Sequence, residues 1–405
     1  MTARERWIAF ASRPTAQWGL YALLAVAASL ASYALGGQAA GHTHYNNYLI
    51  FKTSFPDLLA GRDLYVAHPG PHYDIYKYSP AFALFCGVFA WLPDWLGLIA
   101  WNLLNAWVLF AAIRAVPRLG EGQKAFVVLF VALELLTNMQ NAQSNGLMAG
   151  LMILAYVDLE AGRVGRAALF VALAAFLKPF GLVAAALFLV YPRRTRFCLA
   201  LAGWAVALAV VPLLVTPPRT LLMQYAGWRA MMGADYARSL GLSVAGGLEA
   251  WLGLVPDKRL IVVVGAALFG LAYLNRRAWA LPGFRLLLLA SVLVWVVIFN
   301  HKAESPTFVI AVSGVGLWYV SRRRGAFDLA LLVAVFVLTC LSPTELFPAD
   351  VRSGVIVHWR LKALPCILVW VRILVEQLTF APPAQPCTPA ASEPVRSTNS
   401  TYEPG

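Results

Sequence analysis

Charged residues are scarce in this sequence. They occupy only 13% of its 405 positions, whereas residues of hydrophobic type occupy 60%. A soluble domain usually carries about a quarter charged residues, so this chain has too few to cover a surface that faces water. The composition therefore excludes an ordinary soluble protein and indicates an integral membrane protein.

Acidic residues are also fewer than basic ones, 19 against 32, which gives a formal net charge of +13. Proteins that bind nucleic acid share such an excess, but here the arginines stand in short clusters between apolar segments. Lys and Arg concentrate in the cytoplasmic loops of membrane proteins, where they are attracted to anionic headgroups. The sequence therefore predicts membrane lipids, and not nucleic acid, as the partners of these charges.

Cysteine is rare, with five residues scattered along the chain. An odd, scattered set predicts neither a disulfide framework nor a cysteine metal site. His42 and His44 have the spacing of two metal ligands but lack a third ligand nearby. We therefore predict no metal-ligand set in this chain.

Apolar segments recur whose length suits a hydrocarbon core of roughly 30 Å. Backbone polar groups find no water in lipid, so each such segment must be helical. The sequence thus predicts an all-α polytopic membrane protein of about twelve spans. They are 17–37, 97–115, 124–138, 145–158, 165–178, 180–191, 197–215, 259–275, 284–300, 306–320, 326–342 and 361–380.

The basic clusters sort to one side when the spans alternate from an inward N-terminus. The inward loops then hold Arg114 and Arg118, Arg163 and Arg166, Arg193 to Arg196, Arg276 to Arg285, and Arg322 to Arg324. Segment 80–92 is expected to lie as a helix at the outer interface, because counting it as a span would break this sorting.

The remaining loops define the expected domain organisation. The outward side receives a long first loop, 38–96, a second long loop, 216–258, and all six histidines. We expect one membrane domain over 1–380 and a disordered cytoplasmic tail over 381–405, which is rich in Pro, Ser and Thr. The outward face is the predicted working face.

Polar residues gather in the outward loops without a packing reason. Aromatic rings can stack on sugar faces while amides meet sugar hydroxyls, and an interfacial aromatic belt is the alternative for the first loop. An amide-dense turn follows at 138–145. The predicted substrate-binding residues here are Asn46, Lys77, Tyr78, Gln140, Asn141, Gln143 and Asn145.

Two further outward positions bring ionisable groups to span ends. Lys178 either reaches toward the interface or binds a lipid-linked phosphate. Segment 300–306 places His301, Lys302 and Glu304 together, which is costly at a membrane boundary unless they are paired or used. We predict Glu304 as a general base tuned by His301, with Lys302 binding phosphate. A structural Lys302–Glu304 ion pair is the alternative.

Several short motifs follow one another in a familiar order: Leu58-Leu59-Ala60-Gly61 with Asp63-Leu64-Tyr65, Tyr78-Ser79-Pro80, Gln143-Ser144-Asn145, Lys178-Pro179 and Ser305-Pro306. This order resembles glycosyltransferase family 87. These are multi-span enzymes of the GT-C class that use polyprenyl-phosphate sugars, mannosyltransferases of mycobacterial lipid synthesis among them.

The resemblance implies a GT-C-like helix bundle and an inverting hexosyltransferase. It would move a sugar, with mannose as one candidate, from a polyprenyl-phosphate donor to a lipid or glycan acceptor. The expected location is a bacterial inner (plasma) membrane, with the site facing the periplasm or exterior. The resemblance leaves the need for a divalent metal open.

One position departs from the family. Where the family usually has an aspartate early in the first outward loop, as the expected base, this chain has Asn47. An amide cannot accept the proton of an acceptor hydroxyl. Either another carboxylate replaces it (Glu304 first, then Asp57, Asp63 or Asp74), or the chain binds without catalysing. Asn47 would in both cases position a substrate.

A multi-span transporter is the alternative from another class. Transporters place ionisable groups and broken helices near the membrane midplane, often in repeated halves. Here the ionisable groups stand at span ends and no internal repeat is evident. This favours an enzyme, and a non-catalytic subunit that binds lipid-linked sugars is the third interpretation.

Overall fold

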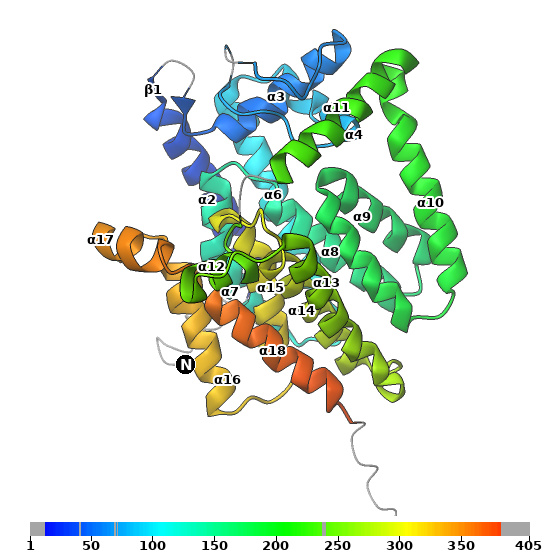
Figure 1. Ribbon diagram of the computed structural model, residues 1–405, viewed down its shortest axis with the longest axis vertical. Helices are drawn as coiled ribbons and strands as arrows, with labels where there is room; N and C mark the ends of the chain where they lie inside the picture. The colour runs from blue at the N-terminus through cyan, green and yellow to red at the C-terminus, as the bar shows by residue number, and fades with distance from the viewer. Residues whose placement is uncertain (1–12, 40–41, 69, 71, 237–239, 382–405) are drawn as a thin grey trace, which may run out of the picture.

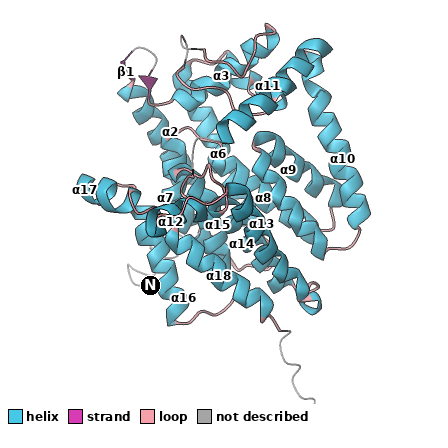
Figure 2. Ribbon diagram, viewed as in Figure 1, coloured by secondary structure: helices cyan, strands magenta, loops and turns pink. Residues whose placement is uncertain are grey.

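The computed structural model describes residues 13–381 except 40–41, 69, 71 and 237–239 (Figure 1). The predicted tail at 381–405 therefore lies almost entirely outside the described residues. Regular structure in the described part is helical, apart from a short antiparallel pair of strands (Figure 2). These are β1 (Gly37–Ala39) and β2 (His42–Thr43). The expectation of an all-α protein is confirmed, with this small exception.

A helix is found at each predicted span. They are α2 (Pro14–Leu35), α6 (Asp94–Ala115), α7 (Glu121–Gln140), α8 (Asn145–Glu160), α9 (Val164–Leu177), η1 (Pro179–Val190), α10 (Arg194–Val210) with η2 (Val211–Leu214), α13 (Lys258–Gly270) with η3 (Leu271–Leu274), α14 (Pro282–Ile298), α15 (Phe308–Val320), α16 (Ala326–Ala334) with η6 (Val335–Leu341), and α18 (Leu364–Leu378).

Four helices of the described residues are long and apolar enough to cross a membrane: Pro14–Leu35, Asp94–Ala115, Glu121–Gln140 and Arg194–Leu214. Five further apolar helices are shorter. The chain is thus an integral membrane protein, and the number twelve stays a prediction.

Shorter helices occupy the connections. They are α3 (Asn46–Leu59), α4 (Pro80–Phe85), α5 (Gly87–Ala90), α11 (Pro218–Tyr236), α12 (Val244–Leu252), η4 (Arg276–Ala278), η5 (Ser305–Thr307), α17 (Ala349–Val351) and η7 (Arg352–Val357). In Figure 1, α3, α4 and α11 gather at one end of the molecule, the top of the view, and α10 runs along one side. The first loop therefore contributes three short helices to this end of the bundle, and a stretch without helix, 60–79, joins α3 to α4.

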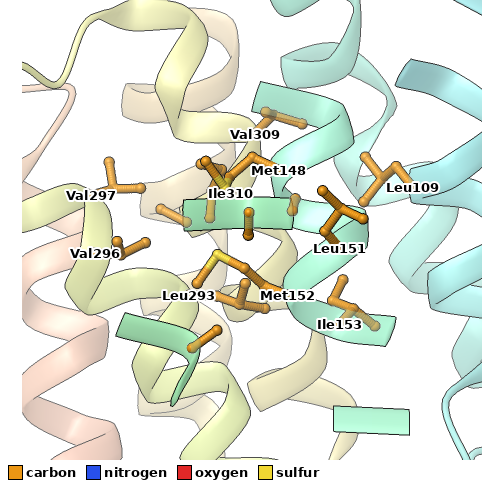
Figure 3. Packing of buried hydrophobic residues seen from close by; sticks show 14 of the residues in the cluster. Leu109, Met148, Leu151, Met152, Ile153, Leu293, Val296, Val297, Val309 and Ile310 are labelled. Carbon is orange, nitrogen blue, oxygen red and sulfur yellow. The ribbon is translucent and has the colours of Figure 1, made fainter. Parts of the chain in front are cut away.

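The centre of the bundle is built around α8. Met148 and Met152 are fully buried, and Figure 3 shows them between Leu109 of α6 and Leu293 of α14. Gly150 lets α6 approach closely, because a Cβ at this position would stand 2.9 Å from the backbone carbonyl of Val108. Small residues of this kind allow apolar helices to pack backbone to backbone.

Ion pairs join the predicted inward loops to one another at one end of the bundle. Glu160, the last residue of α8, pairs with Arg118 after α6 and with Arg285 of α14, the latter at 2.6 Å. Glu376, near the end of α18, pairs with Arg324 at 2.6 Å. The amide-rich turn and the 300–305 turn lie at the other ends of these helices. The helices therefore sort the two sets of loops as the sequence predicts, and the side of the membrane stays a prediction.

Cysteine labelling tests that side. In a chain whose own cysteines are replaced by alanine, Asn141→Cys and Arg323→Cys each place a thiol at an exposed position at one end of the bundle. We expect a membrane-impermeant maleimide to label position 141 in whole cells and position 323 only after lysis. The opposite pattern would contradict the predicted orientation.

Candidate active site

A cavity of about 550 Å³ lies where the first loop, α11, the start of η1 and the 300–305 turn meet. Nine of the twelve predicted site residues line it: Asn46, Asn47, Lys77, Tyr78, Gln143, Lys178, His301, Lys302 and Glu304. They come from four segments far apart in the sequence. The fold thus brings most of the separate polar motifs into one site.

The Tyr78-Ser79-Pro80 motif forms one wall. The Ser79 hydroxyl accepts a bond from Phe82 N–H and caps α4, whose first residue is Pro80. The same hydroxyl donates to the Phe176 carbonyl at 2.6 Å, at the end of α9. This bond fastens the first loop beside Lys178, whose Nζ lies 5.7 Å from the centre of the Tyr78 ring.

Lys178 lies in the turn between α9, which ends at Leu177, and η1. Its ammonium donates to Asn145 Oδ1 at 2.8 Å and to Gln143 Oε1 at 3.3 Å. Burial in the cavity wall lowers the pKa of Lys178 to about 8, and the negative charge of Glu304 opposes part of this shift. No acidic side chain within the described residues pairs with it, so an incoming anion is the partner that would stabilise its charge.

The three other predicted residues do not line the cavity. Asn145 reaches it through the Lys178 ammonium. The Asn141 carbonyl accepts a bond from Asn47 Nδ2 at 2.9 Å, and its side chain bonds back to the Thr137 carbonyl. Gln140 is exposed, and its carbonyl accepts from Ser32. The amide-dense turn therefore positions Asn47 and Lys178 and meets the cavity itself only through Gln143.

Three carboxylates line the cavity, and they differ in their partners. Asp74 pairs with Lys77 at 2.9 Å, and Asp235 of α11 pairs with Lys302 at 3.0 Å. The Lys302–Glu304 alternative is therefore wrong, because Lys302 turns to α11 instead. Glu304 is exposed to the cavity and forms no ion pair with a described residue. Of the three, Glu304 is therefore the one whose carboxylate is available to accept a proton, because the other two are held in ion pairs.

The imidazole of His301 also lines the cavity. Burial lowers the pKa of His301, and the positive charges of Lys258 and Lys302 lower it further, against the opposing charge of Asp235. A neutral ring is therefore favoured near pH 7. In that state it offers one nitrogen to accept and one to donate a hydrogen bond.

Asp57 and Asp63, the lower-ranked candidates for the base, hold the loop together outside the cavity lining. Asp57 is buried and pairs with Arg62 at 2.5 Å. Asp63 accepts the Tyr65 N–H at 2.9 Å. The family motif in this stretch therefore acts as a structural turn, which Gly61 permits with its positive φ of 69°.

The structure adds residues to the site that sequence reasoning missed. They are Ile50, Tyr73, Ile75, Pro179, Phe180, Met231, Met232, Asp235, Asn300 and Thr307, together with Asp74, which was considered only as a base. Asp235 had one usable signal, because acidic residues are rare in the second outward loop. Its partner, 67 positions later in the sequence, gave none.

The cavity carboxylates do not fit a metal site. No group of three His, Cys, Asp or Glu side chains that could hold a metal ion is found in the described part of the chain. Two of the three carboxylates here are already paired with lysines. No step is therefore assigned to a metal.

The fold and this cavity define an integral membrane protein with a polar site at one end of a helix bundle. The family model of glycosyltransferase family 87 matches residues 76–299, more than half of the chain. The chain belongs to glycosyltransferase family 87, and it is a membrane glycosyltransferase.

Two solved structures are also similar to this chain. The crystal structure of ArnT from Cupriavidus metallidurans in the apo state has 15% identity and a TM-score of 0.42, covering 88% of this chain and 76% of that one. The same protein bound to undecaprenyl phosphate has 13% identity and a TM-score of 0.39, covering 89% and 77%. A search of curated proteins found no match.

Proposed function

We propose that this chain transfers a hexose from a polyprenyl-phosphate donor to a hydroxyl of a lipid or glycan acceptor, with inversion at the anomeric carbon. The observation that carries the proposal is one cavity lined by three lysines and by Glu304, whose carboxylate forms no ion pair with a described residue. The family supplies the reaction class. The proposed location is the outer face of a bacterial inner membrane, with the cavity facing the periplasm.

The lysines suit a phosphate leaving group. When the anomeric C–O bond breaks, its electron pair goes to the phosphate, which departs as polyprenyl phosphate. This group needs charge stabilisation and no protonation, so fixed cations serve it better than a general acid. Lys178 is the cation without an acidic partner among the described residues, whereas Lys77 and Lys302 are oriented by Asp74 and Asp235.

Glu304 is the proposed base. Its carboxylate takes the proton of the acceptor hydroxyl as the oxygen forms its bond to the anomeric carbon. Asn47 does not take this role, because an amide has no basic lone pair; its Nδ2 donates to the Asn141 carbonyl. It instead fixes α3 against the turn after α7, and this keeps Asn46 and Asn47 at the cavity edge.

The experiment uses the full chain in proteoliposomes with radiolabelled polyprenyl-phosphate hexoses and a membrane lipid extract. We expect label in a lipid or glycan product, with an equal amount of polyprenyl phosphate released. Label that crosses the vesicle unchanged would identify a transporter. Label that binds but stays on the donor would identify a non-catalytic subunit. Either result would overturn the proposal.

Lys178→Ala is expected to weaken donor binding by roughly 10- to 100-fold, the contribution of one charge-assisted contact of about 1.5–3 kcal/mol. Lys124→Ala is the matched control, because Lys124 lies in the first turn of α7, at the end away from the cavity. This variant should bind the donor normally. Donor binding to the unaltered chain should weaken as the pH rises through about 8, because the ammonium of Lys178 then loses its proton in the donor-free protein. Equal affinity and equal pH dependence in Lys178→Ala would remove Lys178 from the phosphate site.

A further inference from the structure

A second cavity, of about 610 Å³, lies at the arginine-rich end of the bundle, away from the candidate active site. It is formed by the connection from η1 to α10 and by the connection from η4 to α14. Arg193, Arg194, Arg276 and Arg285 line it, and none of its lining residues is acidic. Such a concentration of one charge around a hollow predicts an anionic ligand.

Three of these arginines keep their charge for a ligand. Arg285 is paired with Glu160 at 2.6 Å. Arg193, Arg194 and Arg276 form no ion pair with any residue that the structure describes. The Arg194 guanidinium instead lies over the Trp279 ring, 5.1 Å from its centre, which holds it at the cavity.

The backbone adds donors at the same place. α10 begins at Arg194, and its N-cap residue, Arg193, makes no side-chain capping bond and has a positive φ of 63°. The first N–H groups of a helix lack acceptors within the helix and favour an anion. Arg194 and Thr195, which carry two of these groups, both line the cavity.

An unsatisfied side-chain donor provides an independent indication. The indole Nε1 of Trp279 is buried and has no hydrogen-bond partner among the described residues, and Trp279 lines the cavity. A buried N–H without an acceptor is costly. A phosphate oxygen in the cavity would supply that acceptor.

We propose that this cavity binds the phosphate group of an anionic phospholipid. The apolar surroundings point to a lipid. Leu182 and Leu189 of η1 and Leu199 of α10 are exposed along the helices that leave the cavity, and Leu274 is exposed just before η4. Exposed leucines on a membrane helix suit acyl chains, so headgroup and chains both have a surface to contact. The site is separate from sugar transfer and does not depend on the function proposed above.

The test compares two triple variants of the full chain. Arg193→Ala/Arg194→Ala/Arg276→Ala removes the three cavity charges that lack an ion pair with a described residue and leaves Arg285 with Glu160. Arg196→Ala/Arg277→Ala/Arg323→Ala removes three charges from the same end of the bundle, outside the cavity lining. Purified protein is exposed to equal mixtures of phosphatidylglycerol and phosphatidylcholine, and retained lipid is counted by native mass spectrometry. We expect the unaltered chain and the second variant to retain phosphatidylglycerol selectively, and the first to retain roughly tenfold less.

Equal losses in both variants would show a general effect of surface charge and overturn the proposal. Retention without preference in the unaltered chain would overturn it as well. Thermal stabilisation by inorganic phosphate equal to that by a short-chain phosphatidylglycerol would show a free-phosphate site instead. Loss of retained polyprenyl phosphate in the first triple variant, but not in the second, would assign the cavity to that lipid and overturn the proposal. Trp279→Phe keeps an aromatic ring beside Arg194 but removes the indole N–H, and it should weaken retention even where the triple variant fails to fold.

Discussion

Replacing Glu304 with glutamine is expected to lower the rate of sugar transfer by roughly 10²- to 10⁴-fold, the usual contribution of a general base. The substitution keeps the size of the side chain and removes its ability to accept a proton. Because Glu304 forms no ion pair with a described residue, the surrounding fold should tolerate the change. The measurement is kcat at saturating donor and acceptor, with donor affinity determined separately and expected to stay near its original value.

The other two cavity carboxylates are the controls. Asp74→Asn and Asp235→Asn each release a lysine from its ion pair, so they should raise the KM for the donor more than they lower kcat. Full activity in Glu304→Gln together with loss of kcat in Asp74→Asn or Asp235→Asn would transfer the role of base to that aspartate.

Glu134→Ala is expected to destabilise the protein by about 3–5 kcal/mol, the cost of leaving one member of a buried ion pair without its partner. Glu134 lies in α7 and Lys362 just before α18, with 2.7 Å between their charged atoms. The residues are 0% and 3% exposed, so water cannot replace the lost partner. The measurement is the free energy of unfolding in detergent.

A double variant separates two causes of the expected destabilisation: the buried Lys362 charge left without a partner, and the packing lost with the Glu134 side chain. Glu134→Leu/Lys362→Met replaces both ionic groups by apolar side chains of similar length, and it should recover most of the stability. Lys52 and Asp94 form a partly exposed pair, so Asp94→Ala should cost less than about 1 kcal/mol. A Glu134→Ala protein as stable as the original would show that the buried pair contributes nothing.

The helices could be predicted because lipid leaves the backbone few choices. A segment such as 197–215 must satisfy its own N–H and C=O groups, and it forms α10 and η2 as expected. The arginine clusters then indicated which connections lie at the same end of the bundle. The ion pairs of Glu160 with Arg118 and Arg285 agree with this. Hydropathy and charge act locally and can be seen in one sequence.

The contacts within the site could not be predicted, because they depend on how distant segments meet. Polarity correctly marked 138–145 as an unusual turn. It could not indicate that Gln143 faces the cavity while Asn141 folds back on Thr137, a difference set by the positive φ of 47° at Ala142 between them. In the same way, Lys302 stands two residues from Glu304 in the sequence but reaches Asp235 on α11.

Gln224 joins the two predicted outward loops through a pair of hydrogen bonds. Its buried amide accepts the Leu64 N–H at 3.1 Å and donates to the Arg62 carbonyl at 2.7 Å, so α11 is fastened to the first loop at one turn. If α11 moved alone, the buried amide of Gln224 would lose both hydrogen bonds without gaining water as a replacement, which is costly. Any movement of α11 is therefore expected to carry the turn at 62–64 with it, because the two segments share the hydrogen bonds of Gln224.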